Sequence, residues 1–411
     1  MVRTDIAFDE QIALLMRGVS FGDEALAAAM EAELRERLAE SHATGKPLRV
    51  YLGVDPTSTD LHLGHTVPLR KLRQFQDLGH DVVFLIGSFT ALVGDPSDKD
   101  KARPRLTPEQ VREHAQTYVD QVARILDPER TEIAYNDRWL APLSFADVIE
   151  LASNFTVQQF LTRDNFSERF AKGDPIWLHE FMYALMQAYD AVMLRTDVQV
   201  GGTEQLFNLM AGRKLMEARG MRPQVCLTLP ILAGTDGHMR MSKSTGNAIG
   251  IAERPEEQFG KVMSMPDEAM RNVAELVTRW TPAEIEALFS AIASGALHPR
   301  DAKMRLAFEI VDIFHGTEAA EQAQEHFATV FQQRALPPEI PALALKGPTP
   351  LVEAIVQAGM AGSKSQARRL VTQGGVRLDG QPVDDVDTVV EARGQILQVG
   401  RRRYARLEPA D

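Results

Sequence analysis

A strand pattern that runs through a turn into a helix constrains the fold of this chain most. Apolar residues from Val50 to Val54 precede Asp55 and Pro56, which is typical of a buried strand that ends in a turn. After His65 the apolar residues recur at helical spacing until Gly79. These residues are Leu69, Leu72, Phe75 and Leu78. The pattern predicts a strand, a turn and a helix in close succession.

Two further segments predict the rest of the sheet. Residues 81–86 and 224–232 are almost continuously apolar, as in parallel strands that helices cover on both faces. Long helical patterns separate the three strand candidates. We therefore expect an α/β fold with an open, doubly wound parallel sheet, whose ligands collect at the carboxyl ends of its strands.

The first candidate motif, His62-Leu63-Gly64-His65, lies where the turn gives way to the helix. A helix N-terminus presents unpaired N–H groups and the positive end of the helix dipole, so it favours phosphate. Gly64 has no side chain to obstruct a nucleotide. Position alone leaves a second interpretation open, a turn that carries two surface histidines.

The second candidate motif is Arg240-Met241-Ser242-Lys243-Ser244. Alone it is commonly an exposed loop without a function. Together, the motifs supply two imidazoles and two cations, which suits the binding of the triphosphate of ATP while its α-phosphorus is attacked.

The two motifs resemble the HIGH and KMSKS signatures of class I aminoacyl-tRNA synthetases, with Leu63 for Ile and Arg240 for the first Lys. Within that class, residues 51–57 (YLGVDPT) resemble the bacterial tyrosyl-tRNA synthetases. Residues 90–97, 183–190 and 199–205 match the same group, and the likeness covers nearly the whole chain. The resemblance implies a class I synthetase Rossmann-like fold that activates L-tyrosine with ATP and transfers it to tRNA(Tyr).

A polar stripe on one helix is the candidate tyrosine site. Tyr183, Gln187 and Asp190 stand at i, i+4 and i+7 among apolar neighbours, so they share one face. Buried polar groups need partners, and an internal hydrogen-bond network would also satisfy them. The resemblance implies that Tyr183, Gln187 and Asp95 receive the ammonium of tyrosine. It further implies that Asp190 and Tyr51 bind the phenolic hydroxyl, and that Asp55 and Gln205 contact the amino-acid portion.

The resemblance also implies roles around ATP. The expected catalytic residues are His62, His65, Thr57, Arg240 and Lys243. The expected ATP-binding residues are Gly53, Gly64, Gly201, Gly202, Glu204, Ser242 and Ser244. Mg²⁺ is expected to accompany ATP as a substrate, with no protein-bound metal and no organic cofactor.

Three residues depart from the family pattern. Arg240 presents a planar fork where the family has a compact ammonium. Glu204 stands where the family commonly has Asp, so its reach to the ribose differs. Ser88-Phe89 replaces smaller residues after Gly87.

The chain divides by composition into four segments. We expect a catalytic domain over 1–250 with an inserted dimerisation segment, a helical anticodon-side domain over 251–335, and a proline-rich linker over 336–348. The last segment, 349–411, carries nine Lys and Arg against eight Asp and Glu, while the whole chain has a net charge of −12. Its order of elements resembles a small α+β RNA-binding module of a ribosomal protein. The candidate RNA-binding residues are Lys364, Arg368, Arg369, Arg401, Arg402 and Arg403, although such charges can also form a solvated face.

Composition and segment patterns limit the setting and the partners. A single cysteine, Cys226, excludes an internal disulfide, and no run is long and apolar enough for a signal core or a membrane span, so we expect a cytoplasmic protein. The family forms homodimers through the segment that corresponds to Trp139–Phe170, with the apolar cluster Trp139, Phe145, Phe155 and Phe160; from the pattern alone these four equally fit an internal core.

Two rival functions remain at this point. A class I enzyme for tryptophan shares both motifs, but has no use for Tyr51 and Asp190 directed at a phenol. A non-catalytic RNA-binding paralogue would lack His62, His65 or Lys243, and all three are present.

Overall fold

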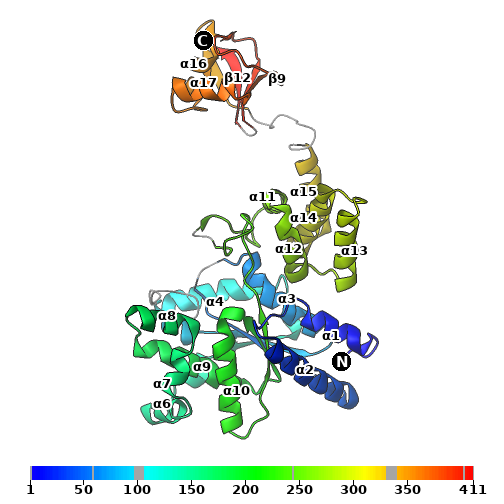
Figure 1. The fold of residues 1–411 in the computed structure, drawn as a ribbon, viewed down its shortest axis with the longest axis vertical. Coiled ribbons are helices and arrows are strands. Elements are labelled where there is room, and N and C mark those ends of the chain that lie inside the picture. The colour runs from blue at the N-terminus through cyan, green and yellow to red at the C-terminus, as the bar shows by residue number, and fades with distance from the viewer. Residues whose placement is uncertain are drawn as a thin grey trace. The chain divides into compact units, whose positions relative to one another are not determined.

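The structure is a computed structural model that describes residues 2–57, 60–96, 106–242, 245–329, 340–400 and 403–410. The chain divides into two compact units, Met1–His326 and Phe327–Asp411 (Figure 1). Each unit has its own hydrophobic core.

A five-stranded parallel sheet lies at the centre of unit 1, in the order β3-β2-β1-β4-β5. The strands are β1 (Arg49–Val54), β2 (Asp81–Ile86), β3 (Thr131–Tyr135), β4 (Val198–Gly202) and β5 (Val225–Leu229). The chain crosses from β3 over to β4 beside β1, which places the topological switch point between β1 and β4. The predicted doubly wound sheet is confirmed, as are its three predicted strands.

Helices cover both faces of this sheet. The helices around the sheet are α1 (Phe8–Met16), α2 (Glu24–Thr44), α3 (Leu63–Asp77), α4 (Pro108–Val122), α5 (Asp137–Leu140), α6 (Phe145–Ala152), α7 (Val157–Leu161), α8 (Asp164–Lys172), α9 (Leu178–Leu194) and α10 (Leu206–Ala218). Tyr51, Val83 and Leu85 share one core with α9 and α10, whereas α3 packs on β1, β2 and β4. Since side chains alternate along a strand, Tyr51 and Leu52 face opposite layers.

Five further helices follow the sheet in unit 1. They are α11 (Pro255–Ser264), α12 (Met270–Val277), α13 (Pro282–Ala293), α14 (Pro299–His315) and α15 (Thr317–Phe327). Among the described residues from 254 to 329 there is no strand, which agrees with the helical pattern of the sequence.

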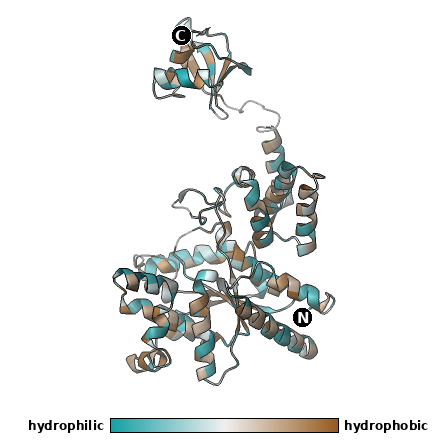
Figure 2. Cartoon of the chain, viewed as in Figure 1, coloured by the Kyte–Doolittle hydropathy of each residue, from teal (hydrophilic) through white to brown (hydrophobic). Residues whose placement is uncertain are grey.

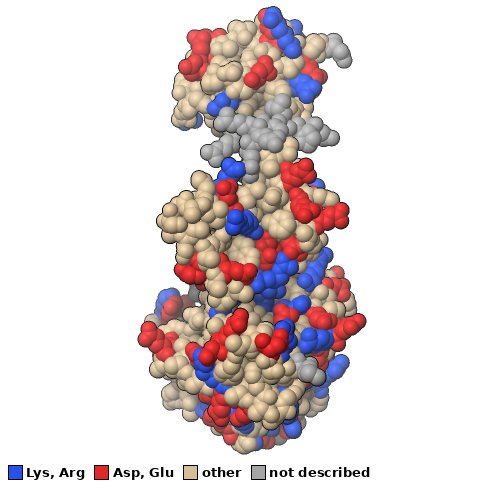
Figure 3. Space-filling model, turned by 90° about the vertical axis from the view of Figure 1, so that its right-hand side faces the viewer, with Lys and Arg blue, Asp and Glu red and all other residues tan. Residues whose placement is uncertain are grey.

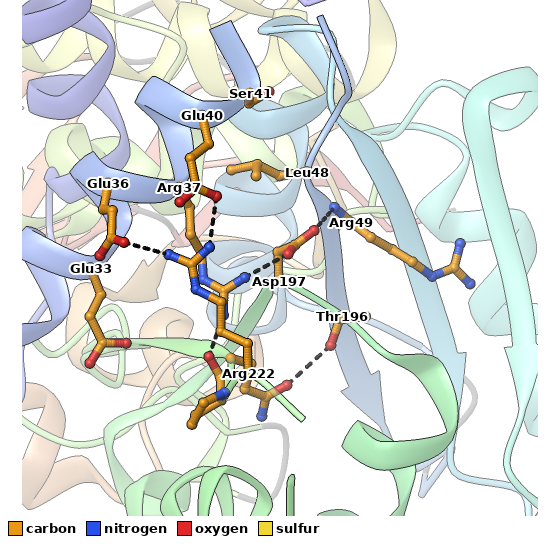
Figure 4. A network of polar contacts seen from close by, with 12 residues as sticks. Glu33, Glu36, Arg37, Glu40, Ser41, Leu48, Arg49, Thr196, Asp197 and Arg222 are labelled. Atoms are coloured by element: carbon orange, nitrogen blue, oxygen red, sulfur yellow. Dashed lines mark hydrogen bonds and ion pairs between the residues drawn. The ribbon is translucent and has the colours of Figure 1, made fainter. Parts of the chain in front are cut away.

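A charged network ties α2 to the amino ends of β1 and β4 (Figure 4). The buried Arg37 guanidinium lies 2.6 Å from Asp197 Oδ1, and Asp197 Oδ2 accepts a hydrogen bond from the backbone N–H of Arg49. Arg222 pairs with Glu36 and Glu40 of α2. Removing one partner would leave the buried charge of Arg37 unpaired, which is costly. The network therefore holds the amino ends of β1 and β4, at the edge of the sheet opposite the one where we expect ligands.

Unit 2 is a small α+β fold. Its elements are β6 (Ala342–Leu345), β7 (Thr349–Pro350), α16 (Leu351–Gln357), α17 (Lys364–Thr372), β8 (Val376–Leu378), β9 (Gln381–Pro382), β10 (Val389–Val390), β11 (Ile396–Val399) and β12 (Arg403–Pro409). β6 pairs with β12, so a strand of this sheet falls inside the segment that we expected to be a linker.

Hydrophobic residues concentrate along the central strands and on the inner faces of the helices (Figure 2). In the described part of the chain no helix is long and apolar enough to cross a membrane.

Candidate active site

Two histidines form the start of α3. His62 is the N-cap residue, and its Nδ1 accepts a hydrogen bond from the N–H of Gly64 at 3.2 Å. The Nδ1 of His65 accepts from the N–H of His62 at the same distance, so the rings make a reciprocal capping box with centroids 3.9 Å apart. Because each Nδ1 accepts, the neutral rings carry their protons on Nε2, which makes each Nε2–H a donor.

Gly64 is required by this packing. A Cβ at position 64 would lie 3.0 Å from Nδ1 and Cε1 of the His62 ring. The predicted helix N-terminus at this motif is confirmed. The absence of a side chain at Gly64 allows the His62 imidazole to pack over the backbone at position 64.

Backbone pairing joins the two sequence motifs. Residue His62 forms an antiparallel bridge with Gly250, and the N–H of Leu63 donates to the carbonyl of Ile249 at 2.9 Å. The N–H of Ile251 donates in turn to the carbonyl of Leu61 at 3.1 Å. The segment that follows the second motif is therefore hydrogen-bonded to the first motif.

A cleft of about 210 Å³ opens above the carboxyl ends of β1 and β4. Of the residues expected from the sequence, twelve line it: Gly53, Asp55, Thr57, His62, Gly64, His65, Asp95, Tyr183, Gly202, Glu204, Gln205 and Arg240. Pro230, Ile231 and Leu232 add an apolar wall after β5 that the sequence did not predict. Burial lowers the pKa of Arg240, whose usual value is high enough that the side chain stays cationic.

Four expected residues are not brought to the cleft by the described structure. Gly201 and Ser242 are absent from its lining, and the N–H of Ser242 donates to Asn247 Oδ1. Lys243 and Ser244 lie outside the described residues. The roles of all four stay predictions.

A second, narrower cavity adjoins the cleft at Gly53, Asp55, Tyr183 and Gln205. It extends inward to Tyr51, Gln187 and Asp190, the remaining residues expected for tyrosine. Tyr51 is fully buried, and its hydroxyl has no hydrogen-bond partner in the described part of the chain. Burial, followed by the charge of Asp190, raises the pKa of Tyr51 well above its usual range, so the hydroxyl remains protonated.

Asp190 is held by two side chains that the sequence analysis missed. Trp139 Nε1 donates to Oδ1 at 2.7 Å, and Asn136 Nδ2 donates to Oδ2 at 3.2 Å. Burial raises the pKa of Asp190 to about 7; these two hydrogen bonds oppose the rise, and the charge of Asp55 adds to it.

The same network reaches the other end of the cavity. Asn136 Nδ2 also donates to Thr90 Oγ1 at 3.1 Å, and Thr90 donates to Asp55 Oδ1 at 2.7 Å. Asp55 Oδ2 accepts from the hydroxyl of Tyr183 at 2.9 Å. A chain of hydrogen bonds thus connects the two carboxylates at opposite ends of the cavity. Thr90 and Asn136 follow the ends of β2 and β3, so the rule that ligands collect at the carboxyl ends of strands would have identified them.

Asp95 and Gln205 border the cleft and contact each other. Gln205 Nε2 lies 3.4 Å from Asp95 Oδ2, and Gln205 Oε1 accepts from the N–H of Gly202 at 3.2 Å. The buried guanidinium of Arg163 lies 3.8 Å from Asp95 Oδ1. Gln187 Oε1 accepts from Asn208 Nδ2 at 3.0 Å, which leaves its amide N–H₂ to face the cavity that it lines.

No group of three His, Cys, Asp or Glu in the described ranges is arranged to hold a metal ion. The carboxylates of Asp55 and Asp190 accept hydrogen bonds from side-chain donors.

The candidate RNA-binding side chains lie on two elements of unit 2. Arg368 and Arg369 are exposed on α17, whereas Lys364 pairs with Glu353 at 2.9 Å. Arg403 begins β12 and donates to the carbonyl of Met360. Arg401 and Arg402 lie outside the described residues. On the face visible in Figure 3, basic and acidic side chains of this unit are interspersed.

The apolar cluster expected for a dimer is mostly internal. Phe160 is buried with Phe166, and Trp139 and Phe155 pack on the main core; only Phe145 is exposed, at 81%. Of the ten large apolar side chains that are exposed in the described structure, six come from residues 145–178. They are Phe145, Ile149, Val157, Phe170, Trp177 and Leu178.

Comparison with known proteins places this geometry in a family. The family described as tRNA synthetases class I (W and Y) matches residues 43–332, and the S4 domain matches residues 349–396.

Curated relatives match over almost their whole length. The tyrosine–tRNA ligase of Moorella thermoacetica is 51% identical over 97% of this chain and 95% of its own length. The tyrosine–tRNA ligase of Thermotoga maritima is 48% identical over 97% of each chain.

Solved structures share the fold. The tyrosyl-tRNA synthetase of Archaeoglobus fulgidus, complexed with L-tyrosine, superposes with a TM-score of 0.60 at 26% identity, covering 77% of this chain and all of that one. The truncated mitochondrial enzyme of Aspergillus nidulans gives a TM-score of 0.64 at 24% identity over 80% of this chain and 95% of that one, which supports the fold alone.

Proposed function

Because this chain belongs to the class I tRNA synthetases, among the tyrosine–tRNA ligases, we propose that its two adjoining cavities carry out tyrosine activation. In the first step the carboxylate of L-tyrosine attacks the α-phosphorus of ATP. A bond forms between oxygen and Pα, the bond from Pα to the bridging oxygen of Pβ breaks, and pyrophosphate leaves. In the second step a hydroxyl of the terminal adenosine of tRNA(Tyr) takes the tyrosyl group and AMP leaves.

The cleft provides the positive groups for the first step. His62 and His65 direct Nε2–H donors at the phosphates, since their Nδ1 atoms are used to cap α3. Arg240 faces the same cleft as a cation, with Lys243 assigned by the motif. No protein nucleophile is needed, so positioning and charge stabilisation account for the catalysis. Mg²⁺ bound to ATP would neutralise phosphate charge, with water and phosphate oxygens as its ligands.

The narrow cavity accounts for tyrosine. Its inner end presents the hydroxyl of Tyr51, which lacks a partner in the described part of the protein, beside a fixed carboxylate on Asp190. A phenolic hydroxyl could donate to Asp190 and accept from Tyr51, which removes the cost of the unpaired buried group. We assign the ammonium of tyrosine to Tyr183, which lines both cavities, together with Gln187 of the narrow cavity and Asp95 of the cleft.

One observation carries the proposal. The segment that follows the second motif is bridged to His62 of the first. Both His62 and Arg240 line a cleft that adjoins a cavity reaching Tyr51 and Asp190. The test is pyrophosphate–ATP exchange with each of the twenty amino acids separately. Exchange with tyrosine alone supports the proposal, and exchange that tryptophan stimulates best would overturn it.

The exposed apolar side chains of residues 145–178 support a homodimer. A monomer rarely leaves so many large apolar groups in water over one segment. Replacing Phe145 and Leu178 by Asp should lower the sedimentation coefficient to that of a monomer, while Met239→Asp, an exposed apolar position elsewhere, should leave it unchanged. A wild-type protein that sediments as a monomer contradicts this part of the proposal.

Unit 2 is assigned to tRNA binding. A chain stopped after Ala335 should retain tyrosine-dependent exchange, because every residue of the cleft precedes this point, and it should charge tRNA poorly. Its charging should also depend less on salt, since phosphate contacts are lost. Loss of exchange in a folded, truncated protein would show that unit 2 contributes to activation.

A further inference from the structure

The segment that carries Arg240 is built around one aspartate. Asp236 Oδ1 accepts from the N–H groups of His238 and Met239, at 2.8 and 2.6 Å. Its Oδ2 accepts from Asn247 Nδ2 at 2.6 Å. These hydrogen bonds, that from Asn247 first, hold the pKa of Asp236 down at about 2, so it is ionised at neutral pH.

Asn247 connects this aspartate to the second motif. Its Nδ2 also lies 3.1 Å from the carbonyl oxygen of Arg240, while its Oδ1 accepts from the N–H of Ser242 at 2.8 Å and from Thr245 Oγ1 at 2.7 Å. Its own carbonyl accepts from the N–H of Thr235 at 2.9 Å. One buried amide, 6% exposed, therefore bonds to the chain on both sides of Met241.

The backbone around this side chain packs closely against it. A Cβ at Gly234 would lie 2.2 Å from Asn247 Nδ2, so the amide occupies the space that any other residue at 234 would fill. The N–H of Met241 donates to the carbonyl of Leu232 at 3.0 Å, which makes residues 232–241 a closed hairpin. The backbone of Arg240 is therefore held by this hairpin where the residue lines the cleft.

We propose that Asn247, bonded to Asp236, is a positioning residue that holds the backbone of Arg240 and Ser242 so that the Arg240 guanidinium meets the leaving pyrophosphate. The inference rests on the proposed function of the cleft. A misplacement of about 1 Å at a reacting group can cost about 100-fold in rate, and the amide is the group in the described chain that hydrogen-bonds to both residues.

The experiment uses the full-length protein and four variants. Asn247→Ala removes the amide, and Asp236→Asn removes the charge. The double exchange, Asp236→Asn with Asn247→Asp, restores a hydrogen bond between the two positions. Thr281→Ala removes an N-cap of α13 and serves as the control for a similar loss of stability away from the cleft.

Two measurements decide the outcome. In pyrophosphate exchange, Asn247→Ala should lower kcat about 10- to 100-fold and leave KM for tyrosine unchanged, while the control keeps both constants. In limited digestion with trypsin, cleavage after Arg240 should accelerate in both single variants. The double exchange should slow it only in part, because a carboxylate at position 247 has no N–H for the carbonyl of Arg240. Equal changes in kcat and in KM for tyrosine, or an unchanged kcat in Asn247→Ala, would overturn the positioning role.

The two proposals fail in different ways. If wild-type protein shows no tyrosine-dependent exchange, the proposed function is wrong, and the digestion still reports whether Asn247 orders the segment. If wild-type exchanges normally and neither measurement changes in Asn247→Ala, only the positioning role is wrong.

Discussion

The two ends of the candidate site are built in different ways. The phosphate end is lined by backbone, glycines and the start of a helix, and its cation comes from a hairpin loop. The tyrosine end is a buried network in which four side chains from three separate segments fix two carboxylates. A backbone N–H survives a change of its side chain, so at the phosphate end the effects of substitution should concentrate on a few charged groups such as Arg240. A buried polar network depends on every member. The two ends should therefore respond differently to substitution and to pH.

The largest expected effect is at the phosphate end. Arg240→Ala removes a cation that meets charge formed mainly in the transition state, so kcat for activation should fall about 100- to 1,000-fold. KM for tyrosine should stay within about twofold of the wild-type value, because the lost interaction forms mainly in the transition state and not in the complex with bound tyrosine. Single-turnover formation of tyrosyl-adenylate would measure both, and a parallel loss of tyrosine affinity would remove the distinction between the two ends.

At the tyrosine end, Asp190→Asn should reduce the preference for tyrosine over phenylalanine. Hydrogen bonds to charged groups contribute about 1.5–3 kcal/mol, which corresponds to a loss of about 10- to 150-fold in the ratio of kcat/KM. Large discrimination between these two amino acids is an established property of tyrosyl-tRNA synthetases, so only its assignment to Asp190 is specific to this chain. An unchanged ratio would place the phenol elsewhere.

The binding constants for the ligands of the two ends should also differ in their dependence on pH. With a pKa of about 7, Asp190 is mainly protonated at a pH of about 6 and mainly ionised at a pH of about 8.5. If the phenol donates to the ionised form, KM for tyrosine should fall about tenfold as pH rises across this range. KM for ATP and the inhibition constant of phenylalanine should lack this step, and the step should vanish in Asp190→Asn.

The smallest expected effect is that of Tyr51→Phe. The lost hydroxyl would accept or donate one neutral hydrogen bond, so the tyrosine preference should drop by about 0.5–1.5 kcal/mol, or about 2- to 10-fold. The protein itself should be at least as stable as wild type, because a buried hydroxyl without a partner in the described structure is removed. Thermal unfolding checks this, and a clear loss of stability would mean that the hydroxyl has a structural partner.

All seven residues expected for tyrosine line the two cavities, whereas Gly201 and Ser242, expected at the phosphate end, do not. The sequence nevertheless explains the structure of the phosphate end more directly. The His62 motif determines its own local structure, because the rings of His62 and His65 cap the helix that begins at this motif. The tyrosine stripe of α9 was visible by its spacing, and it does line the cavity. Its partners Thr90, Asn136 and Trp139 come from other elements, and no local pattern signals which distant residues will meet at a sheet edge.

Sequence reasoning was less useful in the segment expected to pair two subunits. Trp139, Phe155 and Phe160 are aromatic but serve the interior, since a pattern of apolar residues does not show which face of a short helix packs inward. Three of the five strands of the sheet were predictable, because they are nearly continuous apolar runs. The other two, β3 (TEIAY) and β4 (VQVGG), contain polar residues or glycines and were not predicted.

The bridge between His62 and Gly250 can form only late in the synthesis of the chain. These two residues are about 190 positions apart in the chain, and a ribosome that adds roughly 5–20 residues per second needs about 10–40 s to make that stretch. During this interval the capped helix is already emerging, while the strand-like segment that must fasten to it does not yet exist. A nascent chain therefore lacks the bridge that joins these two segments of the cleft until late in its synthesis.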